Sequence, residues 1–307
     1  MRIVFIGTGD IGLPVFQWLT EHHDVVALVC QPDKPVGRKQ ELTPPRIKME
    51  ALARGAKVFQ PPRMRAPEAV EQVKAFGAEV IVVMAYGQIL PKGVLEAASV
   101  ACLNLHASLL PRWRGAAPIQ AAIEAGDAMT GLTVMYMDEG LDTGDILLMR
   151  EMRIAPDETG GSLHDRLAEE SPGTLAIALA LLETGRAPRV PQPTEGVTYA
   201  GKLTREHGTL DFAHGWQVVE RKIRAMNPWP AAATTLDGKR LKVFASIPKP
   251  ELSGEPALVL PSEDGLLVGT GDGSVLLTDI QLEGRSRVSA REFLRGNRVP
   301  SGTKLGV

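Results

Sequence analysis

Residues 2–19, RIVFIGTGDIGLPVFQWL, combine a short apolar run, a glycine-rich turn and a helical pattern. The apolar run Ile3–Ile6 is too short for a helix and ends at a glycine, so it predicts a buried strand. The turn Gly7–Gly12 has the spacing G-x-G-x-x-G and leads into a helix that we expect over Pro14–Leu19. A strand joined to a helix in this way is typical of the first unit of a parallel sheet.

The same alternation continues as far as residue 185. Strands are predicted at Val25–Cys30, Val80–Met84, Val100–Asn104, Leu132–Met137 and Ile146–Met149, and helices at Ile47–Ala53, Pro67–Phe76, Ala116–Ala125 and Ser162–Leu182. Continuous apolar strands that alternate with helices indicate a sheet covered on both faces. We therefore expect residues 1–185 to form an α/β domain, a Rossmann-like, mostly parallel sheet with helices on both faces.

A proline-rich segment separates this part from the rest of the chain. Residues 184–198 hold three prolines and few apolar side chains, so we predict a linker over residues 186–206. Beyond it we expect a helix at Trp216–Met226 and short strands at Leu241–Phe244, Ala257–Leu260, Leu266–Gly269 and Val275–Ile280. Short strands between Gly, Pro and Asp turns are typical of a small β-barrel, which we place at residues 207–307.

The composition argues against several classes of protein. Hydrophobic residues make up 44% of the chain and charged residues 23%, which is the globular average and unlike a disordered, fibrous or membrane-spanning chain. Cys30 and Cys102 lie in separate apolar runs, without the spacing of a zinc or redox motif. The first residues lead straight into a strand, without the apolar stretch of a secretory signal. We expect a cytoplasmic protein that does not associate with a membrane.

The charge distribution differs between the two parts of the chain. Residues 1–206 hold 21 Lys and Arg against 25 Asp and Glu, whereas residues 207–307 hold 13 against 11. The second part is therefore the relatively basic one, and this distribution points to an RNA partner.

The Gly7–Gly12 turn could also bind a dinucleotide. Asp33 follows it at roughly the distance expected of an acid that binds a ribose, which would favour a nicotinamide-dependent dehydrogenase. However, Asp33 lies between prolines, next to the cationic Lys34, Arg38 and Lys39, and this context favours a projecting loop. Any parallel sheet needs a tight turn from its first strand to its first helix, so we expect the glycines to be structural and no NAD to bind.

Polar side chains gather where two strands end. Asn104 and His106 close an apolar strand, and their spacing of two residues puts them on the same face. Open α/β sheets build their sites at the carboxyl ends of their strands. The loop after the strand Leu132–Met137 carries Asp142, which we expect to meet His106. A lone histidine here could be a packing residue, but an adjacent acid and amide favour a catalytic set.

At these residues the sequence resembles the folate-dependent formyltransferases. The resemblance rests on Asn-x-His at 104–106, Ser-Leu-Leu-Pro-x-x-Arg-Gly at 108–115 and Asp-x-Gly-x-Asp-x-Gly-Asp at 138–145. It covers nearly the whole chain. The segments 31–38, 85–91 and 224–230 point, within the family, to the members that act on methionyl-initiator-tRNA. The pair Gly9-Asp10 departs from the family, which more often has Pro followed by an acid after Gly-Thr.

The resemblance implies that an amine attacks the formyl group of 10-formyltetrahydrofolate. The attack produces a tetrahedral centre whose oxygen becomes negative, and hydrogen-bond donors aimed at that oxygen lower the barrier. Asn104 can donate from its amide, and His106 can donate from one ring nitrogen while Asp142 orients the other. His106, or Asp142 through water, could also take the proton that the amine loses. The family requires no metal.

The resemblance also implies two binding surfaces and the kind of second domain. We expect the folate to bind at Ser108, Leu109, Leu110, Pro111, Tyr86, Gly87 and Ile89, and the tRNA at Lys34, Arg38, Lys39, Arg285, Arg287 and Arg291. In the members that act on tRNA an arginine reads the tRNA from the projecting loop, and the resemblance implies that role for Arg38, which occupies the matching position. The second domain is expected to be an OB-like barrel that binds tRNA, and no protein partner is implied.

Three other interpretations stay open at this point. A formyltransferase for a small amine, such as a purine precursor or an amino sugar, would leave the second domain and the basic loop without a role. An NAD-dependent dehydrogenase is distinguished by nucleotide binding. An RNA-binding module without an activity would leave Asn104, His106 and Asp142 unexplained.

Overall fold

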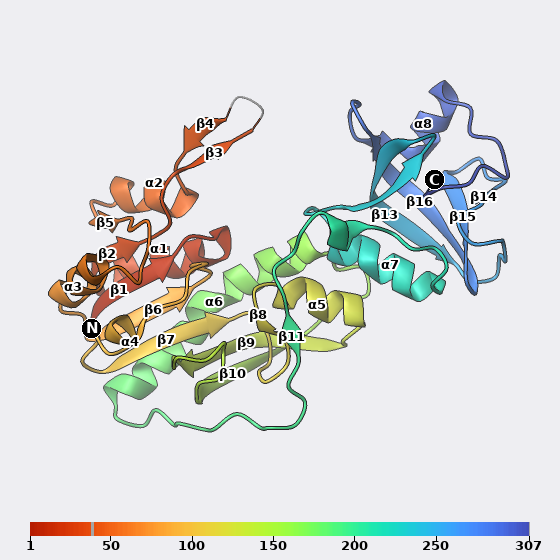
Figure 1. The fold of residues 1–307 in the computed structure, drawn as a ribbon. Helices are drawn as coiled ribbons and strands as arrows, with labels where there is room; N and C mark the ends of the chain where they lie inside the picture. The colour runs from red at the N-terminus through yellow and green to blue at the C-terminus, as the bar shows by residue number, and fades with distance from the viewer. Residues whose placement is uncertain (38–39, 307) are drawn as a thin grey trace. The chain divides into compact units, whose positions relative to one another are not determined.

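The computed structural model describes residues 1–37 and 40–306 (Figure 1). The chain divides into two compact units. The first comprises Met1–Pro118, Met129–Arg153 and His164–Gly201, and the second comprises Ile119–Ala128, Ile154–Leu163 and Lys202–Val307. Because the two units interleave along the chain, the predicted boundaries at residues 185 and 206 stay predictions.

The first unit is built on a seven-stranded sheet in the order β10-β9-β7-β6-β1-β2-β5. Its strands are β1 (Arg2–Gly7), β2 (Asp24–Val29), β5 (Val58–Phe59), β6 (Val80–Met84), β7 (Ala101–His106), β9 (Met129–Tyr136) and β10 (Ile146–Arg153). The five strands β5, β2, β1, β6 and β7, which are adjacent in that order, run parallel to one another. Strand β9 is antiparallel to β7, and β10 is antiparallel to β9. The mostly parallel sheet predicted from the apolar runs is confirmed.

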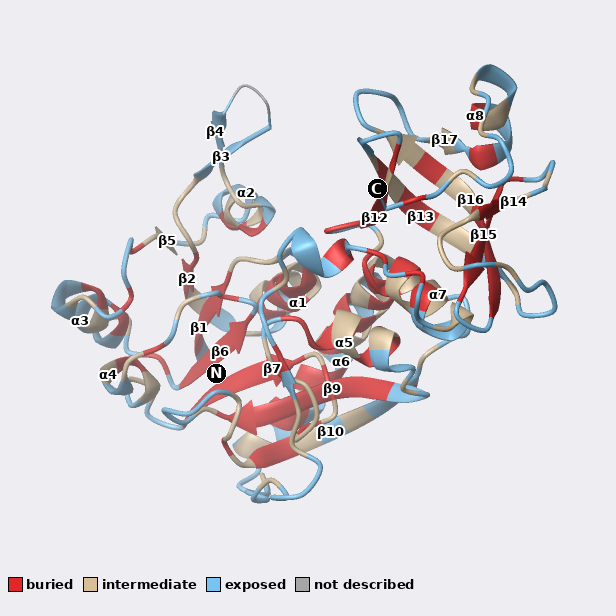
Figure 2. Ribbon diagram, turned by 45° about the vertical axis from the view of Figure 1, so that its right-hand side comes forward, coloured by how far each residue is buried: buried red, intermediate tan, exposed pale blue. Residues whose placement is uncertain are grey.

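Helices cover both faces of this sheet, as predicted. They are α1 (Leu13–His22), α2 (Arg46–Ala53), α3 (Pro67–Ala75), α4 (Lys92–Leu95) and α6 (Gly160–Glu183), whose first turn belongs to the second unit. Val4 and Ile6 point to one face, where they share a buried cluster with Val73 of α3. Phe5 points to the other face and meets Phe16 of α1, with ring centroids 5.7 Å apart. Successive side chains of a strand thus pack on opposite layers, and the central strands are buried (Figure 2).

Residues 34–36 and 41–43 form two paired strands where the sequence predicted only a projecting loop. The strands β3 (Lys34–Val36) and β4 (Glu41–Thr43) pair with each other, and all six of their residues are exposed. Strands this short, with no face against a core, lack the alternating pattern that would reveal them in a sequence. The predicted tRNA-binding residues Arg38 and Lys39 lie outside the described residues.

The second unit contains a curled antiparallel sheet. Its strands are β12 (Ala232–Leu236), β13 (Lys239–Lys249), β14 (Val259–Leu260), β15 (Leu266–Thr270), β16 (Gly273–Leu282) and β17 (Val288–Ser289), and its helices are α5 (Pro118–Ala125), which begins in the first unit, α7 (Trp216–Ala225) and α8 (Ala290–Gly296). The register shifts between Val243 and Ser246, and such bulges bend a long strand.

The last described residues partly close this sheet. Gly306 N–H donates to Thr235 O on β12, and Leu305 N–H donates to Ala257 O beside β14. The terminal segment therefore bridges the two edges of the sheet, which would otherwise expose unpaired backbone groups. The predicted small β-domain is confirmed as a curled, partly closed sheet. Among the described residues, no helix has the length and hydropathy that a bilayer crossing requires.

Candidate active site

The three predicted catalytic residues come together at the carboxyl end of β7. Asn104 and His106 are buried, with 9% and 5% of their surface exposed. Asn104 Nδ2 donates to Asp142 Oδ1 over 3.4 Å, and His106 Nδ1 lies 3.7 Å from Asp142 Oδ2. Two residues on one strand reach the same carboxylate because alternate side chains share a face.

The carboxylate of Asp142 is held by backbone as well as by side chains. Gly115 N–H donates to Asp142 Oδ2 over 2.8 Å. Asp142 itself has a φ of +52°, a left-handed conformation that aspartate tolerates better than most residues. In the same loop, Asp138 Oδ1 accepts hydrogen bonds from Gly140 N and Thr143 Oγ1, which tightens the turn.

The second ring nitrogen of His106 is bound by its own loop. His106 Nε2 lies 2.9 Å from the carbonyl oxygen of Trp113. Because a carbonyl only accepts, this nitrogen carries the proton and Nδ1 faces Asp142. The distance of 3.7 Å from Nδ1 to Asp142 exceeds a hydrogen bond and fits an ion pair when the ring is charged. The sequence suggested a nitrogen free to reach substrate, and here both nitrogens are directed at protein groups.

The loop after β7 is held by hydrogen bonds that Ser108 makes in the interior of the protein. The Ser108 side chain is fully buried and its Oγ donates to Arg112 O over 2.6 Å, while Thr133 Oγ1 donates to Ser108 O over 2.7 Å. Leu110 is also buried, whereas Leu109 and Pro111 are partly exposed. Leu109 and Pro111 therefore offer more side-chain surface to a ligand than Ser108 and Leu110 do.

The segment after β6 also divides into buried and exposed residues. The ring of Tyr86 packs in the core cluster, and burial raises its pKa to about 12. Its hydroxyl has no hydrogen-bond partner among the described residues, and a phenol so hard to ionise is a poor acid or base near neutral pH. Gly87 is exposed, and Ile89 is 77% exposed. A folate-binding role for all three stays a prediction.

Comparison with known proteins identifies the family. The sequence model described as Formyl transferase matches residues 1–179, and the one described as Formyl transferase, C-terminal domain, matches residues 202–298. The chain belongs to the formyl transferase family. The family resemblance seen at the three motifs is thereby confirmed. The chain matches both domain models of the family.

Two relatives match this formyl transferase over nearly its full length. The methionyl-tRNA formyltransferase of Symbiobacterium thermophilum is 46% identical over 310 residues, which cover 99% of this chain and 95% of that protein. The methionyl-tRNA formyltransferase of Xanthomonas axonopodis pv. citri is 45% identical, with 97% of this chain and 98% of that protein covered.

A solved structure resembles this formyl transferase in fold. HypX from Aquifex aeolicus in complex with tetrahydrofolic acid has a TM-score of 0.66 at 20% sequence identity. The match covers 96% of this chain and 47% of HypX, so the chain spans about half the length of that protein. At this identity the likeness shows the fold alone.

In the Gly7–Gly12 turn of the formyl transferase, backbone amides are hydrogen-bonded within the protein. Thr8 N–H and Gly9 N–H both donate to Ala85 O over 3.1 Å, so neither is directed at a phosphate. A Cβ on Gly7 would lie 2.6 Å from Met84 O, so close packing of the backbone is enough to explain why this position is a glycine. Asp33 accepts hydrogen bonds from Lys48 and Gln60, which lower the pKa of its carboxyl group.

The first prediction follows from this turn. We expect no saturable binding of NAD or NADP in isothermal calorimetry, because the amides that would cradle a pyrophosphate are already bonded. Titration with 10-formyltetrahydrofolate on the same sample is the positive control. Micromolar binding of either nucleotide would contradict the structural role of the glycines.

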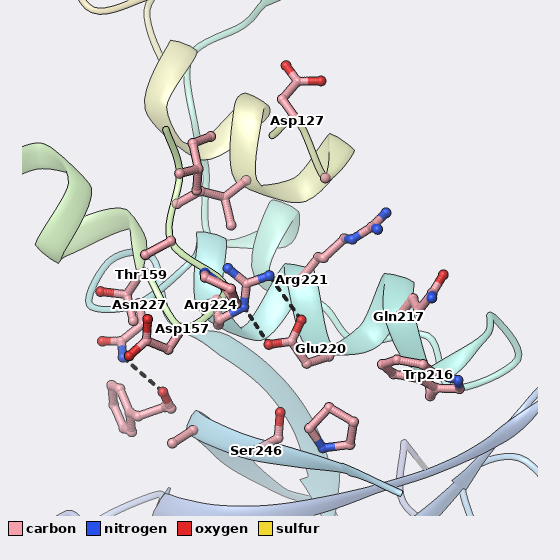
Figure 3. A pocket seen from close by; sticks show the side chains of 18 of the residues that line it. Asp127, Asp157, Thr159, Trp216, Gln217, Glu220, Arg221, Arg224, Asn227 and Ser246 are labelled. Carbon is pink, nitrogen blue, oxygen red and sulfur yellow. Dashed lines mark hydrogen bonds and ion pairs between the residues drawn. The ribbon is translucent and has the colours of Figure 1, made fainter. Parts of the chain in front are cut away.

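A cavity of about 690 Å³ lies in the second unit of the formyl transferase (Figure 3). Its basic side chains are largely engaged. Arg224 pairs with Glu220 and donates to Glu158 O, and Arg287 donates to Asp279 and lies 4.1 Å from the centre of the Phe244 ring. Because both of these guanidinium groups are paired within the protein, we place the chemistry at the site on β7.

The other predicted tRNA contacts are at the surface. Arg285 and Arg291 are exposed in the second unit, and Lys34 is exposed on β3. Arg287 differs from them, because the hydrogen bonds that it donates to Asp279 raise its pKa and occupy its guanidinium group. Sequence reasoning missed the backbone partners Trp113 O and Gly115 N–H, for which no side chain gives a signal.

Proposed function

We propose that this chain transfers the formyl group of 10-formyltetrahydrofolate to the amino group of methionyl-initiator-tRNA. The observation that carries the proposal is the meeting of buried Asn104 and His106 with partly exposed Asp142 at the carboxyl edge of β7. It lies in a chain about 45% identical, over nearly its full length, to relatives named methionyl-tRNA formyltransferase. A cytoplasmic location fits such a role in translation.

The reaction needs one nucleophile, one leaving group and one proton transfer. The amino nitrogen of methionine attacks the formyl carbon, and the bond from that carbon to N10 of the folate breaks. The amine loses a proton, and N10 of the tetrahydrofolate gains one. The second N–H of Asn104 can stabilise the negative oxygen of the tetrahedral intermediate. The His106 and Asp142 pair provides acid–base groups within reach of each other.

The binding surfaces are part of the proposal. Folate would contact the loop after β7, at Ser108, Leu109, Leu110 and Pro111, and the segment after β6, at Tyr86, Gly87 and Ile89. The projecting segment predicted from the sequence, with Lys34, Arg38 and Lys39, would approach the acceptor end of the tRNA. The folate part is supported by partly exposed Leu109 and Pro111 and by exposed Gly87 and Ile89. An apolar surface that is open to solvent suits a pterin ring.

The identity of the formyl acceptor is tested by offering different amines to the protein with the same formyl donor. Wild-type protein with 10-formyltetrahydrofolate should formylate methionyl-initiator-tRNA much faster than a nucleotide-linked amino sugar or a purine-precursor amine. The measurement is the initial rate of formylated product by mass spectrometry. Faster formylation of a small amine would replace the proposed acceptor while leaving formyl transfer intact.

A second prediction concerns the exposed arginines of the second unit. In the double variant Arg285→Ala/Arg291→Ala, the slope of log binding constant against log salt should become shallower. We expect a change of about 0.9 for each phosphate that the variant no longer neutralises. The measurement is filter retention of tRNA across a salt series, with the KM for folate as the control.

Arg287→Ala should change this slope less, because Arg287 is already bonded to Asp279. Superimposable salt curves for wild type and the Arg285→Ala/Arg291→Ala variant would move the tRNA surface elsewhere.

A further inference from the structure

Residues 190–200 lie between the two family matches, which end at residue 179 and resume at residue 202. The sequence assigns them to a linker. In the structure, however, they belong to the first unit and hydrogen-bond to the loops that carry the active site. Val190 pairs with Ile146 at the start of β10, and β11 (Tyr199–Ala200) pairs with β8 (Arg114–Gly115).

Gln192 is the residue of this segment that reaches the Asp142 loop. Its Nε2 donates to Asp142 O and to Gly144 O, both over 2.8 Å. Its Oε1 accepts from Arg114 Nη2 over 2.6 Å and from Arg114 Nε over 3.1 Å. A side-chain amide has two N–H donors and an oxygen with two lone pairs, so Gln192 uses its full hydrogen-bonding capacity here.

These four bonds connect the two loops that hold the reacting groups. One loop supplies Asp142, whose own carbonyl is one of the acceptors of Gln192. The other contains Arg114, which is 8% exposed and stands between Trp113 and Gly115, the residues whose backbone holds His106 and Asp142. The backbone of Asp142 is left-handed, and such a conformation persists only where its surroundings hold it.

We propose that Gln192 is a positioning residue for the reaction, because its amide fixes the Asp142 carboxylate relative to His106. It touches neither of the reacting side chains and acts through the backbone of the Asp142 loop and through Arg114. The inference rests on the proposed formyl transfer, and it makes the segment at 190–200 part of the catalytic site. Displacement of a catalytic group by about 1 Å can cost about a hundredfold in rate.

Gln192→Glu separates positioning from packing. The carboxylate keeps the size of the side chain and gains an ion pair with Arg114, but it turns an oxygen toward two carbonyl oxygens and loses both donors. Gln192→Met keeps a similar volume and loses every hydrogen bond. Gln72→Glu is the matched control, because Gln72 is exposed on α3 and the change in charge is the same.

The experiment measures kcat and KM for both substrates, and the unfolding temperature, on the full chain. We expect kcat to fall about ten- to a hundredfold in Gln192→Glu and Gln192→Met, with both KM values within about twofold of wild type. Gln192→Glu should keep an unfolding temperature close to that of wild type, and Gln72→Glu should keep the wild-type rate.

Two outcomes would overturn the inference. One is a wild-type kcat in both Gln192 variants. The other is a loss of rate that follows the loss of unfolding temperature across Glu and Met, which would make Gln192 a stabilising residue only. Failure of the proposed function is seen separately, because wild-type protein would then not formylate methionyl-tRNA at all.

Discussion

His106→Ala should lower the rate of formyl transfer by at least about a hundredfold while the protein stays folded. Loss of a positioned proton-transfer group or oxyanion donor has this size. His106 is 5% exposed and its ring is bonded to Trp113 O, so removal of the ring also takes away the donor that this carbonyl has in the wild-type protein. The rate should be measured under single-turnover conditions with saturating tRNA, and the fold checked by circular dichroism.

Asp142→Asn tests the same centre without removing a side chain. The variant keeps an oxygen for the Gly115 amide but loses the negative charge beside His106. Glu139→Gln is the control, because Glu139 is exposed in the same loop and loses the same charge. A folded His106→Ala protein with near-normal turnover, or equal rates in Asp142→Asn and Glu139→Gln, would show that the reacting centre lies elsewhere.

The other large effect is expected of Gly115→Ala. Gly115 has a φ of +113°, and a Cβ built on it would lie 2.5 Å from Ala200 O, a backbone atom that cannot rotate away. The loop must therefore shift, and the Gly115 N–H then moves from Asp142 Oδ2. We expect the rate to fall by about a hundredfold, together with a lower unfolding temperature.

Gly185→Ala is the matched control for this change. Gly185 also has a positive φ, of +67°, but a Cβ there meets nothing within 4 Å. The variant adds backbone strain without a clash, so it should keep nearly the wild-type rate. Equal kinetics for the two alanine variants would show that the contact between Gly115 and Ala200 does not matter for the site.

The layered fold could be predicted because its strands are buried on both faces. The run Ile3–Ile6 has no polar residue, and its alternate side chains pack against α3 and α1. β12 was missed because Ala-Ala-Thr-Thr-Leu has small side chains and a weak apolar pattern, although four of its five residues are buried. The packing of the curled sheet, rather than local propensity, decides its conformation.

Only the parts of the site that consist of side chains in a recognisable sequence pattern could be predicted. Asn104 and His106 were identifiable because they end an apolar strand two residues apart. Trp113 O and Gly115 N–H are backbone groups of a loop whose left-handed Trp113, with a φ of +59°, has no sequence signal. Gln192 is 50 residues from Asp142, in a proline-rich segment whose composition is that of a linker. Contacts at this separation depend on how the whole unit folds.

Transfer of a labelled formyl carbon tests the central claim most directly. The full chain is incubated with methionyl-initiator-tRNA and 10-formyltetrahydrofolate labelled in the formyl group, and the amino acid is then released from the tRNA by mild base. We predict labelled N-formylmethionine, in equal amount to the tetrahydrofolate produced. Label that stays on the folate or leaves as formate, while the methionine keeps a free amino group, would contradict the claim.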